Sequence, residues 1–154
     1  MTDQHILPEK LRLLLKQNKY GKLVASKDLD HLPSGKGAYL LLITIDQPFQ
    51  LEISTLPLAE MMRGVYAYCG SARGPGGIKA RLTRHFASDK RKHWHVDHLT
   101  LPSSNLWAIG LLGGDECELN ADLMATGQFS NPVTGFGASD CNICPSHLLF
   151  WQDL

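Results

Sequence analysis

The chain has 154 residues, of which 44% are hydrophobic, and this is enough for one domain with a real core but argues against two. Its 15 Lys and Arg residues balance 15 Asp and Glu residues, so the net charge does not point to a nucleic-acid partner. The N-terminus lacks the pattern of a signal peptide, and no window is apolar enough to span a membrane. We therefore expect a cytoplasmic protein, in which four cysteines favour buried thiols or metal ligands over disulfides.

The N-terminal segment is predicted to be a short helix followed by a connector. Pro8 opens an amphipathic stripe of leucines over residues 9–17, and the residues after it carry mixed charges, proline and glycine. We expect residues 1–36 to form this helix and connector, and residues 37–154 to form the main domain.

Apolar runs predict the strands of that domain. Residues 38–45 are almost unbroken in apolar character, which indicates a buried strand, and the alternation over residues 49–53 predicts the second arm of a hairpin. Residues 56–63 are interpreted as a short helical link. The elements expected further on are a short helix in the histidine-rich segment after residue 92, a strand over residues 105–112, a helix from Asp115 to about residue 127, and an edge strand over residues 147–151.

The segment over residues 64–86 joins a strand to a basic helix through a glycine-rich turn. Tyr66 and Tyr68 alternate with apolar residues, which predicts a half-buried strand whose tyrosines share one face. The turn has little side-chain bulk, so a phosphate could approach its backbone N–H groups. In the helix that follows, Arg81 and His85 lie beside the apolar stripe, where they can face the sheet.

An ordered set of motifs carries a family resemblance. The tripeptide Gly-Ala-Tyr ends at Tyr39, Tyr-Cys-Gly begins at Tyr68, and Arg81 and His85 follow four residues apart. This order resembles the GIY-YIG endonuclease superfamily, with the middle residue of each tripeptide changed. The turn GSARGPGG, the segment KHWHVDHL and the tail GFGASDCNICPSHLLFW further resemble its Uri-type single-domain branch, part of which is described as a domain of unknown function. The resemblance covers most of the chain and implies an α/β (α+β) fold, with a small, mainly antiparallel central sheet flanked by helices.

The resemblance implies an enzyme, a metal-dependent endonuclease that hydrolyses phosphodiester bonds in nucleic acid, with DNA favoured over RNA. This chemistry needs an activated water, a divalent cation such as Mg²⁺ or Mn²⁺, and positive charge near the phosphate. The resemblance would make Tyr39 or Tyr68 the group that positions or deprotonates the water, and Arg81 the clamp on the scissile phosphate. His85 would hold a phosphate or assist proton transfer.

The superfamily also needs a metal-binding carboxylate on a later helix, for which Glu116 and Glu118 compete. With Leu119 and Leu123 on the buried face, the helical wheel places Glu116 at the centre of that face and Glu118 nearly opposite. Asp115 and Glu118 have the spacing of a capping box, which gives Glu118 a structural role. We expect Glu116 to bind the metal, and its alternative role is to interact with the helix dipole.

A second metal site is suggested by the run Cys-x-x-Cys-x-x-His, formed by Cys141, Cys144 and His147. This spacing is zinc-like, and Cys117 could complete a tetrahedral set. Only one Cys-x-x-Cys pair exists, so buried thiols that support the tail are favoured over a structural zinc, and both stay open. Cys69 is expected to be a small buried hydrophobic residue.

Basic residues concentrate between Arg73 and His93, where seven Lys or Arg accompany one acid, Asp89. His93 and His95 lie at the end of this region beside Trp94, which suggests contact with a nucleic-acid backbone or base stacking. Metal binding and a core or capping role are the alternatives for these histidines. No nucleotide cofactor is expected, since no Walker or dinucleotide fingerprint follows the glycine turn. The predicted nucleic-acid contacts are Ser71, Arg73, Lys79, Arg84, Lys92, His93 and His95.

Two other classes of function stay open. A non-catalytic nucleic-acid-binding module would keep the basic helix, and it predicts salt-sensitive binding without cleavage. A zinc-stabilised interaction domain would hold one zinc ion per chain and lose it in the variant Cys141→Ser.

Overall fold

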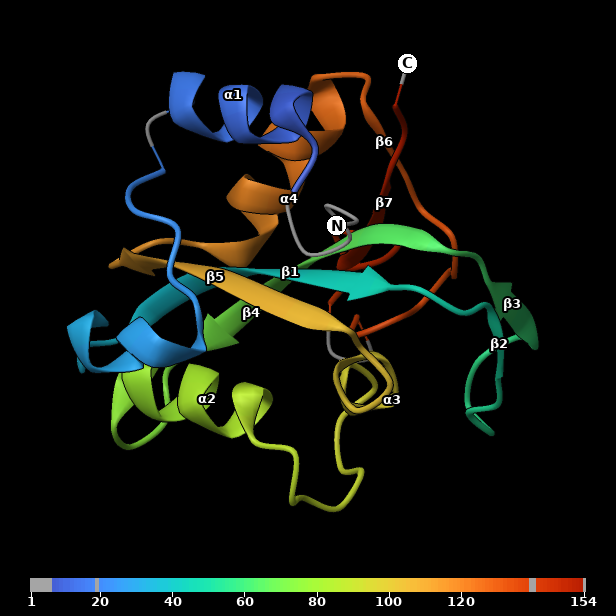
Figure 1. The fold of residues 1–154 in the computed structure, drawn as a ribbon, viewed down its shortest axis with the longest axis horizontal. Coiled ribbons are helices and arrows are strands. Elements are labelled where there is room, and N and C mark those ends of the chain that lie inside the picture. Colours follow the sequence, from blue (N-terminus) through green and yellow to red (C-terminus); the bar gives the residue numbers. More distant parts are fainter. Residues whose placement is uncertain (1–6, 19, 139–140, 154) are drawn as a thin grey trace, which may run out of the picture.

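The computed structural model describes residues 7–18, 20–138 and 141–153, and they form a sheet with helices on both faces. The helices are α1 (Glu9–Gln17), α2 (Gly77–Phe86), α3 (Asp97–Thr100) and α4 (Glu116–Ala125), with a 3-10 helix η1 (Ser26–His31). The strands are β1 (Gly37–Ile45), β2 (Phe49–Leu51), β3 (Ala59–Met61), β4 (Gly64–Ala72), β5 (Asn105–Leu112), β6 (Phe129–Ser130) and β7 (Leu148–Trp151). The expected α+β fold is confirmed (Figure 1). Among these helices, none has the length and apolar character needed to cross a membrane.

Five antiparallel strands form the main sheet in the order β5-β1-β4-β7-β6. β1 pairs with β4 along its whole length and with β5 on its other side. α1 and α4 lie over one face of the sheet, and α2 and α3 lie over the other (Figure 1). Because both faces are covered, β1 is buried on both sides, and this explains its continuous apolar sequence.

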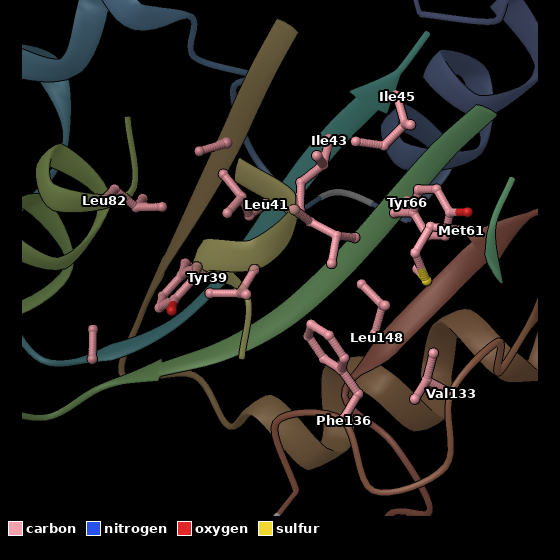
Figure 2. Packing of buried hydrophobic residues seen from close by; sticks show 14 of the residues in the cluster. Tyr39, Leu41, Ile43, Ile45, Met61, Tyr66, Leu82, Val133, Phe136 and Leu148 are labelled. Atoms are coloured by element: carbon pink, nitrogen blue, oxygen red, sulfur yellow. The ribbon is translucent and has the colours of Figure 1, made fainter. Parts of the chain in front are cut away.

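Alternate side chains of β1 belong to two separate hydrophobic cores. Tyr39 and Leu41 join the core that includes Leu82 of α2, and Figure 2 shows them along β1 with Leu82 on the neighbouring helix. Leu40 points to the opposite core, which includes Leu11 of α1. Tyr39 belongs to the first of these cores and also lines the cleft described below.

The described part of the N-terminal segment packs onto the same fold. Leu11 of α1 is completely buried in the second core. Val24 exchanges two backbone hydrogen bonds with Ala108 of β5, at 2.7 and 2.8 Å. The Gly35 carbonyl accepts the backbone N–H of Ile78 at 2.9 Å. The segments 7–18 and 20–36 therefore share the cores and the hydrogen bonds of the rest of the described chain.

The expected strands at β1, β4 and β5 and the expected helices at α1 to α4 are confirmed, but three local expectations are wrong. β2 is not a hairpin partner of β1, because it pairs with β3 in a separate two-stranded sheet. Residues 56–63 accordingly contain a strand and not a helical link. β7 is not an edge strand, since the short β6 pairs outside it. Both sides of β1 are taken by the longer strands β4 and β5, whose apolar side chains complete the two cores and exclude β2.

Candidate active site

A cleft of about 510 Å³ is lined by Tyr39, near the start of β1, and by Tyr68, in the middle of β4. Arg81 of α2 and Glu116 of α4 also line it, so four of the five residues predicted to be catalytic meet there. The remaining lining residues are Ser71, His93, Trp94, His95, Gly137, Cys141 and His147.

The register of β1 and β4 sets the position of both tyrosines. Tyr39 is opposite Gly70, and a Cβ at position 70 would overlap the ring of Tyr39. The absence of a side chain at Gly70 therefore lets this ring lie across β4. The ring centroids of Tyr39 and Tyr68 are 6.3 Å apart. Burial raises the pKa of Tyr68 to about 12 and that of Tyr39 well above its ordinary value, so both hydroxyls are protonated at neutral pH.

His85 lies behind Tyr39, outside the lining of the cleft. It is 1% exposed, and its Nε2 is 2.6 Å from the Tyr39 hydroxyl. Burial, together with the nearby Lys90 ammonium, lowers the pKa of His85 to about 3, so the imidazole is uncharged at neutral pH. Its Nδ1 is buried and has no hydrogen-bond partner among the described residues. This geometry favours a role through the Tyr39 hydroxyl over direct contact between His85 and a phosphate.

The indole of Trp94 holds two arginine side chains of α2. The guanidinium carbons of Arg81 and Arg84 lie 4.2 and 4.0 Å from its ring centroid, which are cation–π distances. The rings of His85 and His93 lie 5.8 and 5.3 Å from the indole, centroid to centroid. A nucleic-acid base stacked on Trp94 would have to displace one of these neighbours. The indole is therefore better placed to orient Arg81 than to stack on a base.

Asp97 organises the segment that carries Trp94. Its buried carboxylate accepts two hydrogen bonds from Arg84, at 3.0 and 2.9 Å. It also accepts the backbone N–H groups of His93 and Trp94, at 2.8 and 2.9 Å. Burial alone would raise the pKa of Asp97, but these hydrogen bonds outweigh it and lower the pKa to about 2. Asp97 is not among the residues predicted from the sequence, although it is the lone acid among residues 90–98.

The choice of Glu116 over Glu118 agrees with the burial of the two side chains. Glu116 lines the cleft, and its Oε2 is buried without a hydrogen-bond partner among the described residues. Glu118 is exposed, and its backbone N–H and that of Cys117 bind the Asp115 carboxylate at 2.9 and 2.8 Å. A buried carboxylate oxygen without a partner is costly, and carboxylates are preferred ligands of magnesium and manganese. The residues present therefore fit a divalent-cation site at Glu116.

Three cysteines and a histidine form a second cluster beside the cleft. Cys117 comes from the first turn of α4, whereas Cys141, Cys144 and His147 precede β7. Their ligand atoms all lie within 4.8 Å of one another, and this Cys3His cluster could bind a metal such as zinc. The three thiols are only partly buried, so the alternative of buried thiols is wrong for them. Cys69 is buried, as expected.

The Cys3His cluster shares residues with the cleft, because its members Cys141 and His147 also line the cleft. The Cys141 sulfur accepts the backbone N–H groups of Cys144 and Ile143, at 3.3 and 3.4 Å. These hydrogen bonds lower the pKa of Cys141 to about 6, which favours the thiolate, the form that binds metals. The sequence identified the four candidate ligands, but the position of Cys141 and His147 at the cleft follows from the tertiary structure.

The start of α2, directly after the glycine-rich turn, packs on the loop that precedes β1. The N–H groups of Ile78 and Lys79 donate to the carbonyls of Gly35 and Pro33, both at 2.9 Å. A Cβ on Gly77, whose φ is +60°, would overlap the Gly35 carbonyl. Glycine is therefore needed at this position for close packing of the helix start on the preceding loop. The N–H groups of Ile78 and Lys79 are therefore not available to a phosphate, because protein carbonyls already accept their hydrogen bonds.

The predicted nucleic-acid contacts occupy different environments. Ser71, His93 and His95 line the cleft, and Arg73 and Lys92 are exposed outside it. Lys79 lies 3.7 Å from the exposed carboxylate of Asp30. The guanidinium of Arg84 is bound to Asp97, which gives it a structural role. Three of the seven predicted contacts therefore line the cleft, and the guanidinium of Arg84 is engaged by Asp97.

Gly137 is a cleft residue that the sequence analysis did not identify. Its backbone N–H donates to Nδ1 of His95 at 2.9 Å, and this bond ties the tail to the histidine segment. Burial lowers the pKa of His95, which favours the neutral imidazole that can accept this bond. A Cβ on Gly137 would lie 2.7 Å from the Tyr68 ring, so the glycine also leaves room for that tyrosine.

Comparison of the chain with curated proteins and with solved structures finds no match. Among protein families, the model described as "Domain of unknown function DUF123" matches residues 38–154. This match includes every residue that lines the cleft and all four members of the Cys3His cluster. Because the match extends over most of its length, the chain belongs to the DUF123 family.

Proposed function

We propose that the cleft is the active site of a metal-dependent endonuclease that hydrolyses phosphodiester bonds in nucleic acid, with DNA favoured over RNA. The observation that supports this most strongly is the meeting in one cleft of Arg81, two tyrosines and Glu116, whose Oε2 has no hydrogen-bond partner among the described residues. A phosphodiester needs a cation and a hydrogen-bond donor for its oxygens, and it needs a positioned water. The GIY-YIG resemblance of the sequence assigns the same residues to these tasks.

Each side chain has a role that follows from its surroundings. Arg81 donates hydrogen bonds to oxygens of the scissile phosphate, and Trp94 keeps its guanidinium at the cleft. Tyr39 has a raised pKa and stays protonated, so it orients the attacking water and does not remove its proton. Neutral His85 fixes the Tyr39 hydroxyl from behind. Magnesium or manganese, when bound to Glu116, would neutralise charge that develops on the phosphate.

The Glu116 carboxylate also separates this proposal from a non-catalytic nucleic-acid-binding module. A phosphate that entered the cleft without a cation would meet a carboxylate oxygen that no described residue neutralises. Like charges at close range oppose binding. A surface that only binds phosphates has no use for such a group, whereas a metal-dependent hydrolase requires it.

Zinc is the ion that best suits the Cys3His cluster. Three sulfurs and one imidazole nitrogen are soft and borderline ligands, which select zinc over magnesium or calcium. Four protein ligands complete a tetrahedral shell and leave no open position for water, which is typical of a structural zinc. The proposed protein therefore carries two kinds of metal site, with separate tasks.

The test is cleavage by the purified protein of plasmid DNA and of RNA in the presence of magnesium or manganese. We expect the wild type to cut, and Arg81→Ala to lower the rate by roughly 100-fold without loss of fold. Arg12→Ala is the control, because Arg12 is exposed on α1 and lies outside the cleft. A wild type that cleaves neither nucleic acid with either ion contradicts the proposal, and salt-sensitive binding in the same sample would support the binding module.

A further inference from the structure

The position of Glu116 depends on how the first turn of α4 is held. Glu116 is the first residue of this helix, directly after the capping residue Asp115. The side chains of this turn are at most partly buried, and full burial on α4 begins at Leu119. Core packing therefore fixes the middle of α4 more firmly than the turn that carries the proposed metal ligand.

The Cys3His cluster joins this turn to the rest of the site. Cys117 directly follows Glu116, and its Sγ lies 3.6 Å from Sγ of Cys141 and 3.8 Å from Nε2 of His147. The His147 carbonyl accepts the backbone N–H of Cys69 at 3.0 Å. Cys69 is the neighbour of Tyr68 on β4, so a metal in the cluster would connect the Glu116 turn to the strand that carries a cleft tyrosine.

Two of the distances between the ligand atoms are close to those of a tetrahedral zinc site, and all of them are within 4.8 Å. Zinc–sulfur bonds of about 2.3 Å and zinc–nitrogen bonds of about 2.0 Å imply sulfur–sulfur edges of about 3.8 Å and sulfur–nitrogen edges of about 3.5 Å. The separations of Cys117 from Cys141 and from His147, at 3.6 and 3.8 Å, lie close to these edges. A disulfide would need sulfurs about 2 Å apart, which this pair does not approach.

We propose that zinc in the Cys3His cluster clamps the first turn of α4 and so holds the Glu116 carboxylate in the cleft. The zinc site would thus position the carboxylate that binds the catalytic cation. This inference rests on the proposed nuclease function for the identity of that cation. The clamp itself depends only on the position of the Cys3His cluster relative to α4 and does not require nuclease activity. A second contact, from the Asn120 side chain to the Ser146 carbonyl at 3.0 Å, links α4 to the tail one turn later. Loss of zinc should therefore loosen the first turn without unfolding the helix.

The test compares Cys144→Ser with the wild type. Cys144 belongs to the cluster but does not line the cleft, so its replacement leaves the cleft side chains unchanged. Cys69→Ala is the matched control, since it removes a thiol outside the cluster. Elemental analysis measures the zinc content per chain, and hydrogen exchange measures the protection of the amides of residues 117–119. A titration without nucleic acid measures the Mn²⁺ affinity.

We expect one zinc per chain in the wild type and in Cys69→Ala. In Cys144→Ser we expect loss of zinc, faster exchange in the first turn of α4, and Mn²⁺ binding weakened by about tenfold or more. Amide exchange in α2 should not change. If Cys144→Ser does not fold, the wild type stripped of zinc by a chelator replaces it in the comparison. The protection of residues 117–119 should then return when zinc is added back.

Two outcomes measured without nucleic acid would overturn the clamp: a reduced wild type that contains no zinc, or zinc loss that leaves both exchange of residues 117–119 and Mn²⁺ affinity unchanged. Neither readout requires cleavage. A wild type that shows the zinc-dependent protection but cuts no nucleic acid would contradict the nuclease proposal while the clamp stands. A wild type that cuts equally well with and without zinc would contradict the clamp alone.

Discussion

The hydroxyl of Tyr39 lies 2.6 Å from Nε2 of His85, although the two residues are 46 positions apart in the chain. The bond connects β1 to α2 in a buried environment, where a hydrogen bond also fixes orientation. Because His85 is uncharged and Tyr39 is protonated at neutral pH, one hydroxyl can contact both the imidazole and the cleft.

Replacement of Tyr39 by phenylalanine should separate catalysis from stability. We expect the cleavage rate of Tyr39→Phe to fall by roughly 100-fold, because the attacking water loses its positioning group. Tyr66→Phe is a matched control, since Tyr66 is also buried on this face but its hydroxyl donates to the Met62 carbonyl at 2.7 Å. Cleavage assays measure the rate, and urea denaturation measures the free energy of unfolding. Equal loss of activity in the two variants would exclude a special role for Tyr39.

The two glutamates of the first turn of α4 give a second matched pair. Glu116→Gln should abolish Mn²⁺ binding and metal-dependent cleavage, because an amide is a much weaker ligand than a carboxylate. Its free energy of unfolding should stay equal or rise, since a buried oxygen without a partner loses its charge. Glu118→Gln should change neither cleavage nor Mn²⁺ binding, because that side chain is exposed. Equal Mn²⁺ affinities in the two variants would contradict the proposal that Glu116 binds the metal.

Acid should destabilise the protein through His85. The pKa of this histidine falls from 6.5 to about 3 on folding, so the unfolded chain binds the extra proton first. The stabilising contribution is complete above pH 6.5 and is lost as the pH falls toward 3, with a loss of about 2 kcal/mol by about pH 5. Urea denaturation at neutral pH and at about pH 5 should show a smaller loss for His85→Gln than for the wild type. Replacement of the exposed His31 by Gln should leave the loss unchanged.

Asp97 should stabilise the fold over a different range of pH. Its pKa is lowered from 3.8 to about 2 on folding, so its contribution is present above 3.8 and is lost as the pH falls toward 2. We expect Asp97→Asn to lower the free energy of unfolding at neutral pH by about 2 kcal/mol, and the difference from the wild type to shrink below about pH 4. Asp30→Asn serves as the control, because the Asp30 side chain is 96% exposed and its contact with Lys79 is screened by water. A difference that does not depend on pH would show that Asp97 acts by shape and not by charge.

Local periodicity was sufficient to predict several parts of the site. The unbroken apolar run before residue 46 predicted β1, and alternation around Tyr66 and Tyr68 predicted β4 with its tyrosines on one face. The helical wheel also placed Glu116, and not Glu118, toward the interior. These predictions succeeded because neighbouring side chains on a regular element have fixed directions, whatever that element packs against.

Other features depend on which elements meet, and sequence patterns do not contain that information. β2 has the alternation of a hairpin arm but pairs with β3, because β4 and β5 occupy both sides of β1. The glycine turn leads into α2, and only the structure shows that the N–H groups of Ile78 and Lys79 donate to the carbonyls of residues 35 and 33. In the sequence, Asp97 is one acid in a basic segment, and only the structure shows that its carboxylate accepts two hydrogen bonds from Arg84.

The sequence by itself determined the type of most elements, the residues that face inward, and the membership of two candidate metal sites. The tertiary structure decided that Tyr39, Tyr68, Arg81 and Glu116 share one cleft, and that Cys141 and His147 form part of its wall. The reason is physical: helix and strand periods act over a few residues, whereas the cleft arises from strand register and helix packing between segments far apart in the chain.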